Sequence, residues 1–242
     1  MSSEKSILLI NPNSTESMTN KIVESVQPYV SSGYELRGAT PADTPPSIEG
    51  YYDEAMSLAG LLRAVSDGEK AGADAFIVAC FGDPGLNACR EIATGPVLGI
   101  CESAMYAASM IADSFTIVTT LERSVPKLEG LVRRYGMETR CRNIRAAGVP
   151  VLALEDHASG ARDLVRQQVV TAVKEDRCEA IILGCAGMAD LTEWLTSETG
   201  TPVIDGCVAA VKFAEALVGA NMRTSKVGSY ARPRSKNRPS QP

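Results

Sequence analysis

Two cysteines, Cys80 and Cys185, are the residues whose type and position point most directly to chemistry. Each ends an apolar run and precedes a turn of small residues: 76–86 reads FIVACFGDPGL and 181–191 reads IILGCAGMADL. A parallel α/β sheet binds ligands beyond the carboxyl ends of its strands, where both thiols are expected. Amides at the start of a following helix would lower the pKa of such a thiol and attract anionic groups.

The two cysteine segments also match each other, which indicates an internal duplication. Residues 75–86 align with 180–191 at an offset of 105, and PVLGICESA (96–104) aligns with PVIDGCVAA (202–210) at an offset of 106. The starts of the two halves, SILLINPNSTE and SFTIVTTLE, are similar as well. Strand–turn–helix units can match by chance, but two blocks in the same order favour duplication.

A duplicated scaffold would place the two thiols on opposite walls of one cleft. One thiolate would remove a proton from a stereocentre, and the opposite thiol would protonate the other face, which is racemisation. Backbone N–H groups of 81–82 and 186–187 are the expected donors to the enolate oxygen. The alternative is structural, because a thiol at the end of an apolar strand commonly packs as a small hydrophobic group. That interpretation is preferred for Cys89, Cys101, Cys141, Cys178 and Cys207.

Short apolar runs alternate with helical patterns along the chain, which predicts parallel sheets covered by helices on both faces. The expected strands are 6–10, 34–37, 74–80, 96–100, 114–119, 142–147, 180–185 and 202–205. The expected helices include 16–29, 52–71, 103–112, 121–135, 159–175 and 207–218. The proline-rich loop 38–50 is long enough to act as a lid or binding loop. The fold class is therefore α/β, with two pseudo-symmetric parallel-sheet domains and the active site in the cleft between them.

The composition of the 242 residues gives no sign of nucleic-acid or membrane binding. The formal net charge is −5, and no apolar run approaches the roughly 20 residues that span a bilayer. Residues 1–6 show no secretory signal, and seven cysteines without a disulfide framework favour a reducing, cytoplasmic compartment. The basic, proline-rich segment 223–242 predicts a flexible solvated tail, with a subunit contact or partial cover of a site as alternatives.

Motifs for other catalytic and cofactor chemistry are missing. A Cys–His hydrolase would have to use the single histidine, His157. No closely spaced Cys or His pair predicts a metal site, and no glycine-rich phosphate-binding motif occurs. We therefore expect neither a metal nor a cofactor.

Four segments resemble the hydantoin/allantoin racemase branch of the aspartate/glutamate/hydantoin racemase superfamily: INPNST (10–15), CFGDPGL (80–86), VTTLERSVP (118–126) and GCAGM (184–188). The resemblance extends from about residue 6 to residue 232. It implies a cofactor-independent two-base racemase with two α/β domains, 1–100 and 101–204. It also implies that the last helix, 205–222, packs back on the first domain and that the protein is a homo-oligomer.

The resemblance further implies that Cys80 and Cys185 are the two bases. The other implied site residues hold ring amides and carbonyls or line the same space: Asn13, Ser14, Thr119, Thr120, Phe81, Gly82, Asp83, Ala186 and Gly187. Asn13 and Thr119 each precede a glutamate by three residues, so capping a helix is the alternative role for both.

The implied substrates are small cyclic ureides, either 5-monosubstituted hydantoins or allantoin. The C5 proton of a hydantoin lies beside a carbonyl, so a thiolate can remove it without pyridoxal phosphate or a metal. Two other classes remain open. One is a one-thiol isomerase or decarboxylase, as in maleate isomerases and arylmalonate decarboxylases. The other is a small-ligand binding protein, whose thiols would react slowly with alkylating agents.

Overall fold

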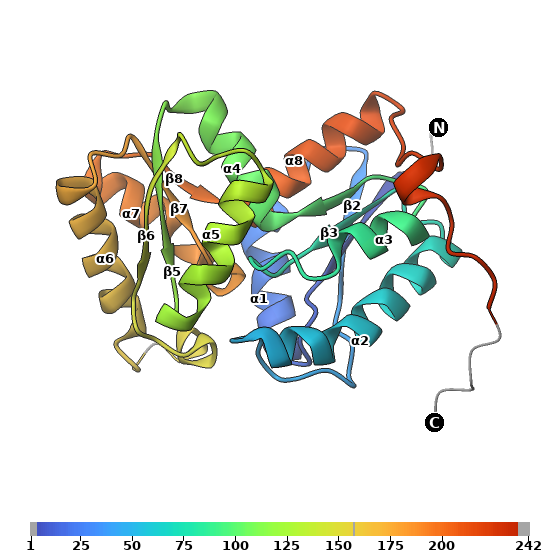
Figure 1. The fold of residues 1–242 in the computed structure, drawn as a ribbon, viewed down its shortest axis with the longest axis horizontal. Helices are drawn as coiled ribbons and strands as arrows, with labels where there is room; N and C mark the ends of the chain where they lie inside the picture. The colour runs from blue at the N-terminus through green and yellow to red at the C-terminus, as the bar shows by residue number, and fades with distance from the viewer. Residues whose placement is uncertain (1–3, 157, 237–242) are drawn as a thin grey trace.

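Two four-stranded parallel sheets form the framework of the described residues, 4–156 and 158–236, in the computed structural model (Figure 1). The first sheet has the order β2-β1-β3-β4, and the second has the order β6-β5-β7-β8. Their bounds are β1 (Lys5–Ile10), β2 (Tyr34–Ala39), β3 (Ala75–Val78), β4 (Val97–Gly99), β5 (Phe115–Thr119), β6 (Cys141–Ala146), β7 (Ala180–Leu183) and β8 (Val203–Asp205). The same strand order in both halves confirms the predicted two-domain α/β fold.

The central strands β3 and β7 are buried along their whole length, because helices cover both faces of each sheet. The register pairs Ile10 of β1 with Val78 of β3, and Val118 of β5 with Leu183 of β7. The strands of each pair therefore end level. The residues that follow them are brought together at one edge of each sheet.

The part of the chain that the structure describes has eight α-helices, of which seven connect consecutive strands and the last follows β8. They are α1 (Glu16–Val26), α2 (Tyr51–Lys70), α3 (Leu86–Ile92), α4 (Ile100–Ile111), α5 (Val125–Arg134), α6 (Ala161–Glu175), α7 (Thr192–Thr199) and α8 (Gly206–Gly219). Helices α2 and α3 cover the outer face of the first sheet, and α6 and α7 cover that of the second (Figure 1). Helices α1, α4, α5 and α8 lie between the sheets.

One apolar core extends across both halves of the molecule. It contains Ile7 and Leu9 of the first sheet, Phe115 and Ile117 of the second, and the inner faces of the four central helices. Helices α4 and α8 approach closely at their first residues, where a Cβ on Gly206 would overlap the Ile100 carbonyl oxygen. Glycine is therefore required at this contact.

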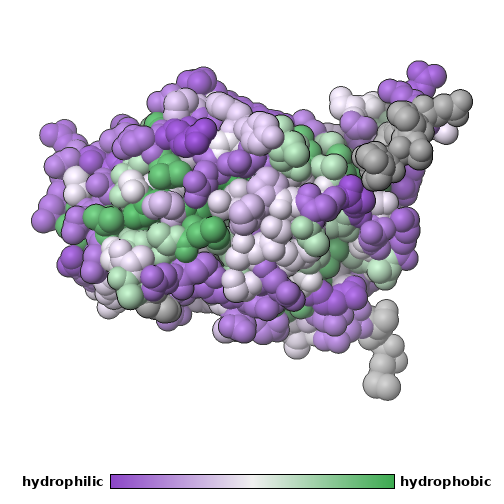
Figure 2. Space-filling model, turned by 90° about the horizontal axis from the view of Figure 1, so that it is seen from below, coloured by the Kyte–Doolittle hydropathy of each residue, from purple (hydrophilic) through white to green (hydrophobic). Residues whose placement is uncertain are grey.

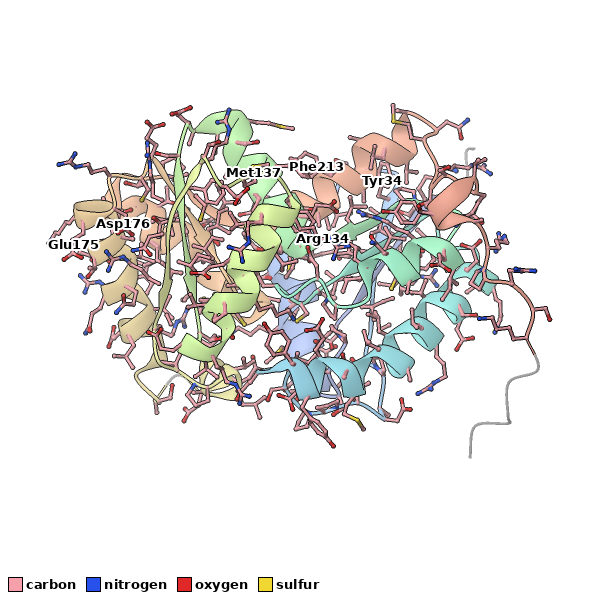
Figure 3. The ribbon with its side chains drawn as sticks, viewed as in Figure 1. Tyr34, Arg134, Met137, Glu175, Asp176 and Phe213 are labelled. Atoms are coloured by element: carbon pink, nitrogen blue, oxygen red, sulfur yellow. The ribbon has the colours of Figure 1, made fainter. Side chains whose placement is uncertain are left out.

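Helix α8 also contacts the first sheet. The Tyr34 hydroxyl of β2 donates a hydrogen bond to the Glu215 carbonyl oxygen of α8 (2.9 Å). Figure 3 shows Tyr34 and Phe213 beside this helix, and both pack against the shared core. At the other end of the molecule, Figure 3 shows Asp176 directly after α6, where its carboxylate accepts from the Arg145 guanidinium of β6 (2.7 Å).

The basic segment after α8 differs from the predicted solvated tail. Thr224 donates hydrogen bonds to the carbonyl oxygens of Thr94 (3.1 Å) and Gly95 (2.6 Å), beside the end of α3. The Lys226 ammonium donates to the Arg90 carbonyl oxygen (2.5 Å). The first part of this segment therefore packs on the first half, because its cations meet free carbonyls at a helix C-terminus. Residues 237–242 lie outside the described residues.

The surface seen in Figure 2 is mainly hydrophilic, with hydrophobic residues gathered on the half that holds the second sheet. None of the helices in ranges 4–156 and 158–236 has the length and apolar character needed to cross a bilayer.

Candidate active site

A cavity of about 220 Å³ lies between the two halves, and both Cys80 and Cys185 line it. One water molecule occupies about 30 Å³ in the liquid, so the cavity has room for a small ring with a substituent. The predicted site residues among its walls are Asn13, Cys80, Phe81, Gly82, Thr119, Thr120, Cys185 and Ala186. Residues from both halves therefore meet at one site.

The two thiols occupy matched positions in the two halves. Each lies two residues beyond the end of a buried central strand, β3 for Cys80 and β7 for Cys185, and each is half-buried. The backbone amides of Gly82 and Gly187 lower the pKa of the Cys80 thiol and of the Cys185 thiol, respectively. Two of the amides expected to bind an enolate oxygen therefore also favour the charged form of each sulfur.

The structure overturns the predicted lowering of the thiol pKa by helix N-termini. Burial raises the pKa of Cys80, opposed by the Lys127 ammonium and the Gly82 amide. Burial raises the pKa of Cys185 to about 12, opposed chiefly by the Gly187 amide. Desolvation dominates because the chain after Cys80 forms a turn and α3 begins six residues later, while Cys185 precedes only the 3-10 turn Ala186–Leu191.

Asn13 lies in a hydrogen-bonded turn after β1 that fixes its side chain at the cavity. Its side-chain oxygen accepts from the Asn11 amide (2.8 Å) and from the Thr15 backbone N–H (2.9 Å). Its own amide contacts the Met18 sulfur (3.4 Å). The residue that caps α1 is Thr15, so the alternative role of Asn13 as the cap of this helix does not hold.

Thr119 is the last residue of β5, and its hydroxyl donates to the Gly184 carbonyl oxygen (3.3 Å) in the loop that carries Cys185. The turn that follows begins after Leu121, so Thr119 is not a helix cap either. Thr120 is also buried at the cavity wall. Thr119 thus links the first strand of the second half to the second cysteine loop.

Three predicted site residues do not line the cavity. Ser14 donates its backbone N–H to the Pro45 carbonyl oxygen (3.0 Å), and Gly187 lies behind Cys185. Asp83 turns away from the cavity. Its carboxylate accepts from the backbone N–H groups of Cys101 (3.1 Å) and Glu102 (2.9 Å) at the start of α4.

The Asp83 carboxylate also accepts from the Tyr135 hydroxyl (2.7 Å). Burial raises the pKa of Asp83 to about 7. Asp83 therefore caps α4 and does not contact the reacting groups. The prediction that it lines the substrate space is wrong, because short-range sequence pattern does not show which helix a loop carboxylate will reach.

Six further polar residues that the sequence analysis did not identify line the cavity: Asn11, Glu49, Tyr51, Arg123, Ser124 and Lys127. Glu49 belongs to loop 38–50, and its carboxylate accepts the Val151 backbone N–H of the second half (2.8 Å). The end of this loop therefore forms part of the cavity wall, and its role as a lid or binding loop stays a prediction. Asn11 directly follows a strand, which is a signal that could have identified it.

The remaining cysteines match the structural interpretation. Cys89, Cys101 and Cys207 are fully buried, Cys178 is buried, and Cys141 is half-buried beside the second sheet. Within the described part of the chain, no group of three or more potential ligands could hold a metal ion. His157, the candidate base of a hydrolase, lies outside the described residues.

Comparisons with known proteins agree with this architecture. The family profile "Asp/Glu/Hydantoin racemase" matches residues 7–214. The chain is 52% identical to a hydantoin racemase of Rhizobium meliloti and 46% identical to one of Pseudomonas sp. strain NS671. These alignments cover 95% of this chain and 95% and 92% of the relatives.

A solved structure of an allantoin racemase from Klebsiella pneumoniae superposes with a TM-score of 0.96 at 44% identity. The superposition covers 98% of this chain and 97% of that structure. The profile match and these identities confirm the resemblance drawn from the cysteine motifs. The chain belongs to the Asp/Glu/Hydantoin racemase family and is an isomerase of the racemase type.

Proposed function

We propose that this protein is a cofactor-independent two-base racemase of 5-monosubstituted hydantoins. The observation that carries the proposal is the placement of two matched cysteines on one cavity between pseudo-symmetric halves. A two-faced reaction needs one base on each side of the stereocentre. The relatives named as hydantoin racemases support the substrate class.

In the proposed reaction, the thiolate of one cysteine removes the C5 proton, and its S–H bond forms as the C–H bond breaks. The electron pair passes to the adjacent carbonyl oxygen as an enolate. The other cysteine then donates its thiol proton to the opposite face of C5 and is left as the thiolate. The two sulfurs exchange roles when the mirror-image substrate reacts.

The cavity walls supply groups for a ureide ring. Asn13 is held by its oxygen, so its amide can donate to a ring carbonyl. Met18, Leu128 and Val151 give the cavity apolar surface suited to a hydrocarbon substituent at C5.

Allantoin is the second candidate substrate. The charged groups of Glu49 and Arg123 also line the cavity, and both can hydrogen-bond a polar ureido substituent. The similarity to the allantoin racemase structure supports this alternative. Assays with both ureides under identical conditions rank the two.

The test is proton exchange at C5 in heavy water, followed by NMR for each enantiomer separately. Wild type should racemise and exchange both enantiomers of a 5-alkyl hydantoin. Cys80→Ser and Cys185→Ser should each lower racemisation by about 100- to 10,000-fold, the usual contribution of a general acid or base. Each variant should retain exchange from one enantiomer, and from opposite enantiomers in the two cases.

Cys178→Ser is the matched control, because this thiol is buried away from the cavity. It should keep wild-type racemisation. Full racemisation by either single active-site variant would reject the two-base mechanism. A one-thiol reaction would be favoured if one of these variants lost exchange from both enantiomers while the other variant kept wild-type exchange.

A further inference from the structure

Two lysines, Lys21 and Lys127, occupy matched positions in the two halves. They are 106 residues apart, the offset that also relates Asn13 to Thr119. Lys21 is on α1, which follows the first strand of the first half, and Lys127 is on α5, which follows the first strand of the second half. Both helices lie between the sheets (Figure 1). The repeat therefore duplicates a cation as well as a thiol.

Lys127 reaches from the second half to the cysteine loop of the first. It lines the cavity, and its ammonium lies so close to Gly82 that a Cβ on this glycine would overlap it. Its partner is Glu54 of α2, at 2.5 Å, and both side chains are largely buried, with exposed fractions of 18% and 23%. The cation is held beside the loop in a setting where solvent screening is weak.

Lys21 reaches in the opposite direction, from the first half to the cysteine loop of the second. Its ammonium donates to the carbonyl oxygens of Leu154 (3.2 Å) and Gly187 (3.3 Å). It also pairs with Asp190 (3.5 Å) and Glu155 (3.9 Å). Each cysteine loop is thus contacted by a lysine of the other half.

We propose that Lys127 and Lys21 are positioning residues that act crosswise, each stabilising the thiolate of the cysteine in the opposite half. The proposal rests on the roles proposed above for the two thiols. An ammonium near a desolvated thiolate favours its charged form, and a carboxylate beside that ammonium reduces the effect. The repeated cations would keep either sulfur able to act as the base, as a reversible racemisation requires.

The electrostatic surroundings of each thiol agree with this arrangement. At Cys80, Lys127 lowers the thiol pKa, whereas Asp83 and Glu54 raise it. At Cys185, Lys21 lowers the thiol pKa, whereas the neighbouring Cys80 and Glu155 raise it. At each sulfur, one lysine therefore favours the thiolate, and a carboxylate that pairs with this lysine disfavours it.

The test measures the ionisation of each thiol directly, by the pH dependence of its alkylation with iodoacetamide, read by peptide mass spectrometry. Cys80 is followed in a Cys185→Ser background and Cys185 in a Cys80→Ser background. Lys127→Met should slow alkylation of Cys80 about tenfold at fixed pH, because loss of an opposite charge raises a pKa by about one unit or more. It should change alkylation of Cys185 less than about twofold. Lys21→Met should show the reverse pattern.

Charge and packing are separated by two further variants. Lys127→Arg keeps the charge and should keep most of the alkylation rate of Cys80. Glu54→Gln removes the carboxylate that offsets the ammonium, so alkylation of Cys80 should become faster. If Lys127 had only a structural role, removing its carboxylate partner would not make alkylation of Cys80 faster. Lys70→Met is the control, because this lysine is exposed and pairs only with Asp67 of its own helix among the described residues.

An uncrossed pattern, an equal effect on both thiols, or a slower reaction in Glu54→Gln would overturn the proposal. The result is independent of turnover, because alkylation needs no substrate. If racemisation survives in Cys80→Ser or Cys185→Ser, the proposed function fails even where the crossed effect is found. If both serine variants are inactive but the crossed effect is absent, only the role of the lysines fails.

Discussion

The two cysteine loops place the same group at the same position by different means. After Cys80 the chain turns at Asp83, whose N–H bonds to the Cys80 carbonyl oxygen (2.9 Å) and whose φ is positive (43°). After Cys185 the chain enters a 3-10 turn at once. Each loop is contacted by a lysine of the other half, but the first loop is also connected to α4 through the Asp83 carboxylate.

The caps of the two matched helices differ in a corresponding way. Asp205, at the end of β8, accepts from the Cys207 N–H (2.6 Å) and caps its own following helix, α8. The matched position at the end of β4 is Gly99, and a Cβ there would overlap the carboxylate of Asp83. A carboxylate thus caps both helices, but in the first half it comes from the cysteine loop. The duplication preserves the positions of the sulfurs and of the two lysines, but not the source of the carboxylate that caps the following helix.

The largest expected effect concerns pH and would sharpen the difference between the two thiols. Burial raises the pKa of both, so the thiolate fraction increases as pH rises, and kcat/KM should increase about tenfold per pH unit from pH 6 to 8. In exchange assays, Cys185→Ser and Cys80→Ser each report the one remaining thiol, and both exchange rates should rise with pH because burial raises both pKa values.

Two neighbouring thiols ionise as a pair, so the wild-type profile reports values that belong to the pair. The single variants remove this coupling. A profile that is flat between pH 6 and 8 would mean that one thiol is already ionised. That result would contradict the dominance of burial.

The next effect would break the equivalence of the two helix caps. Gly99→Ala forces the Asp83 carboxylate from the start of α4 and should lower the free energy of unfolding by about 3 kcal/mol, from overpacking and a lost cap. Asp205→Ala loses only a cap and should cost about 1 kcal/mol. Urea unfolding followed by circular dichroism measures both. Equal losses would show that Asp83 does not depend on the glycine.

The smallest effect concerns the segment that packs only on the first half. Lys226 donates to carbonyl oxygens at the end of α3, whereas α7 ends in Gly200, whose N–H bonds to the Thr196 carbonyl oxygen. Lys226→Met should lower the free energy of unfolding by about 0.5 kcal/mol, the usual value of a cation at a helix C-terminus. Thermal unfolding measures this change, with Lys236→Met as the control. A change no larger than the control's would mean that the contact contributes nothing.

The elements that the sequence predicted well are those with continuous apolar runs. FIVA and IILG become β3 and β7 within two residues of the predicted bounds, because buried parallel strands need such runs. A helix was expected after each cysteine turn, but the bounds of the short helices α3 and α7 were not predicted, because each carries too little periodicity to be distinguished from a loop. The repeat correctly predicted that both thiols border one cavity.

What the sequence could not supply are the properties that depend on packing between distant segments. The direction of the thiol pKa follows from burial by both halves, so no local motif determines it. The route of the Asp83 carboxylate to α4 depends on the space left by Gly99. The sequence contains Lys21 and Lys127 at the offset of the repeat, but it does not show that each contacts the cysteine loop of the other half.

The apolar core that spans both halves has a consequence for ligand traffic. Separating the halves like a hinge would expose the side chains of this core to water, at about 25 cal/mol for each Å². Displacing loop 38–50 breaks the bond between Glu49 and Val151, which is worth about 1.5–3 kcal/mol as a bond to a charged group. We therefore expect a ligand to enter and leave by displacement of loop 38–50, at a lower free-energy cost than separation of the two halves.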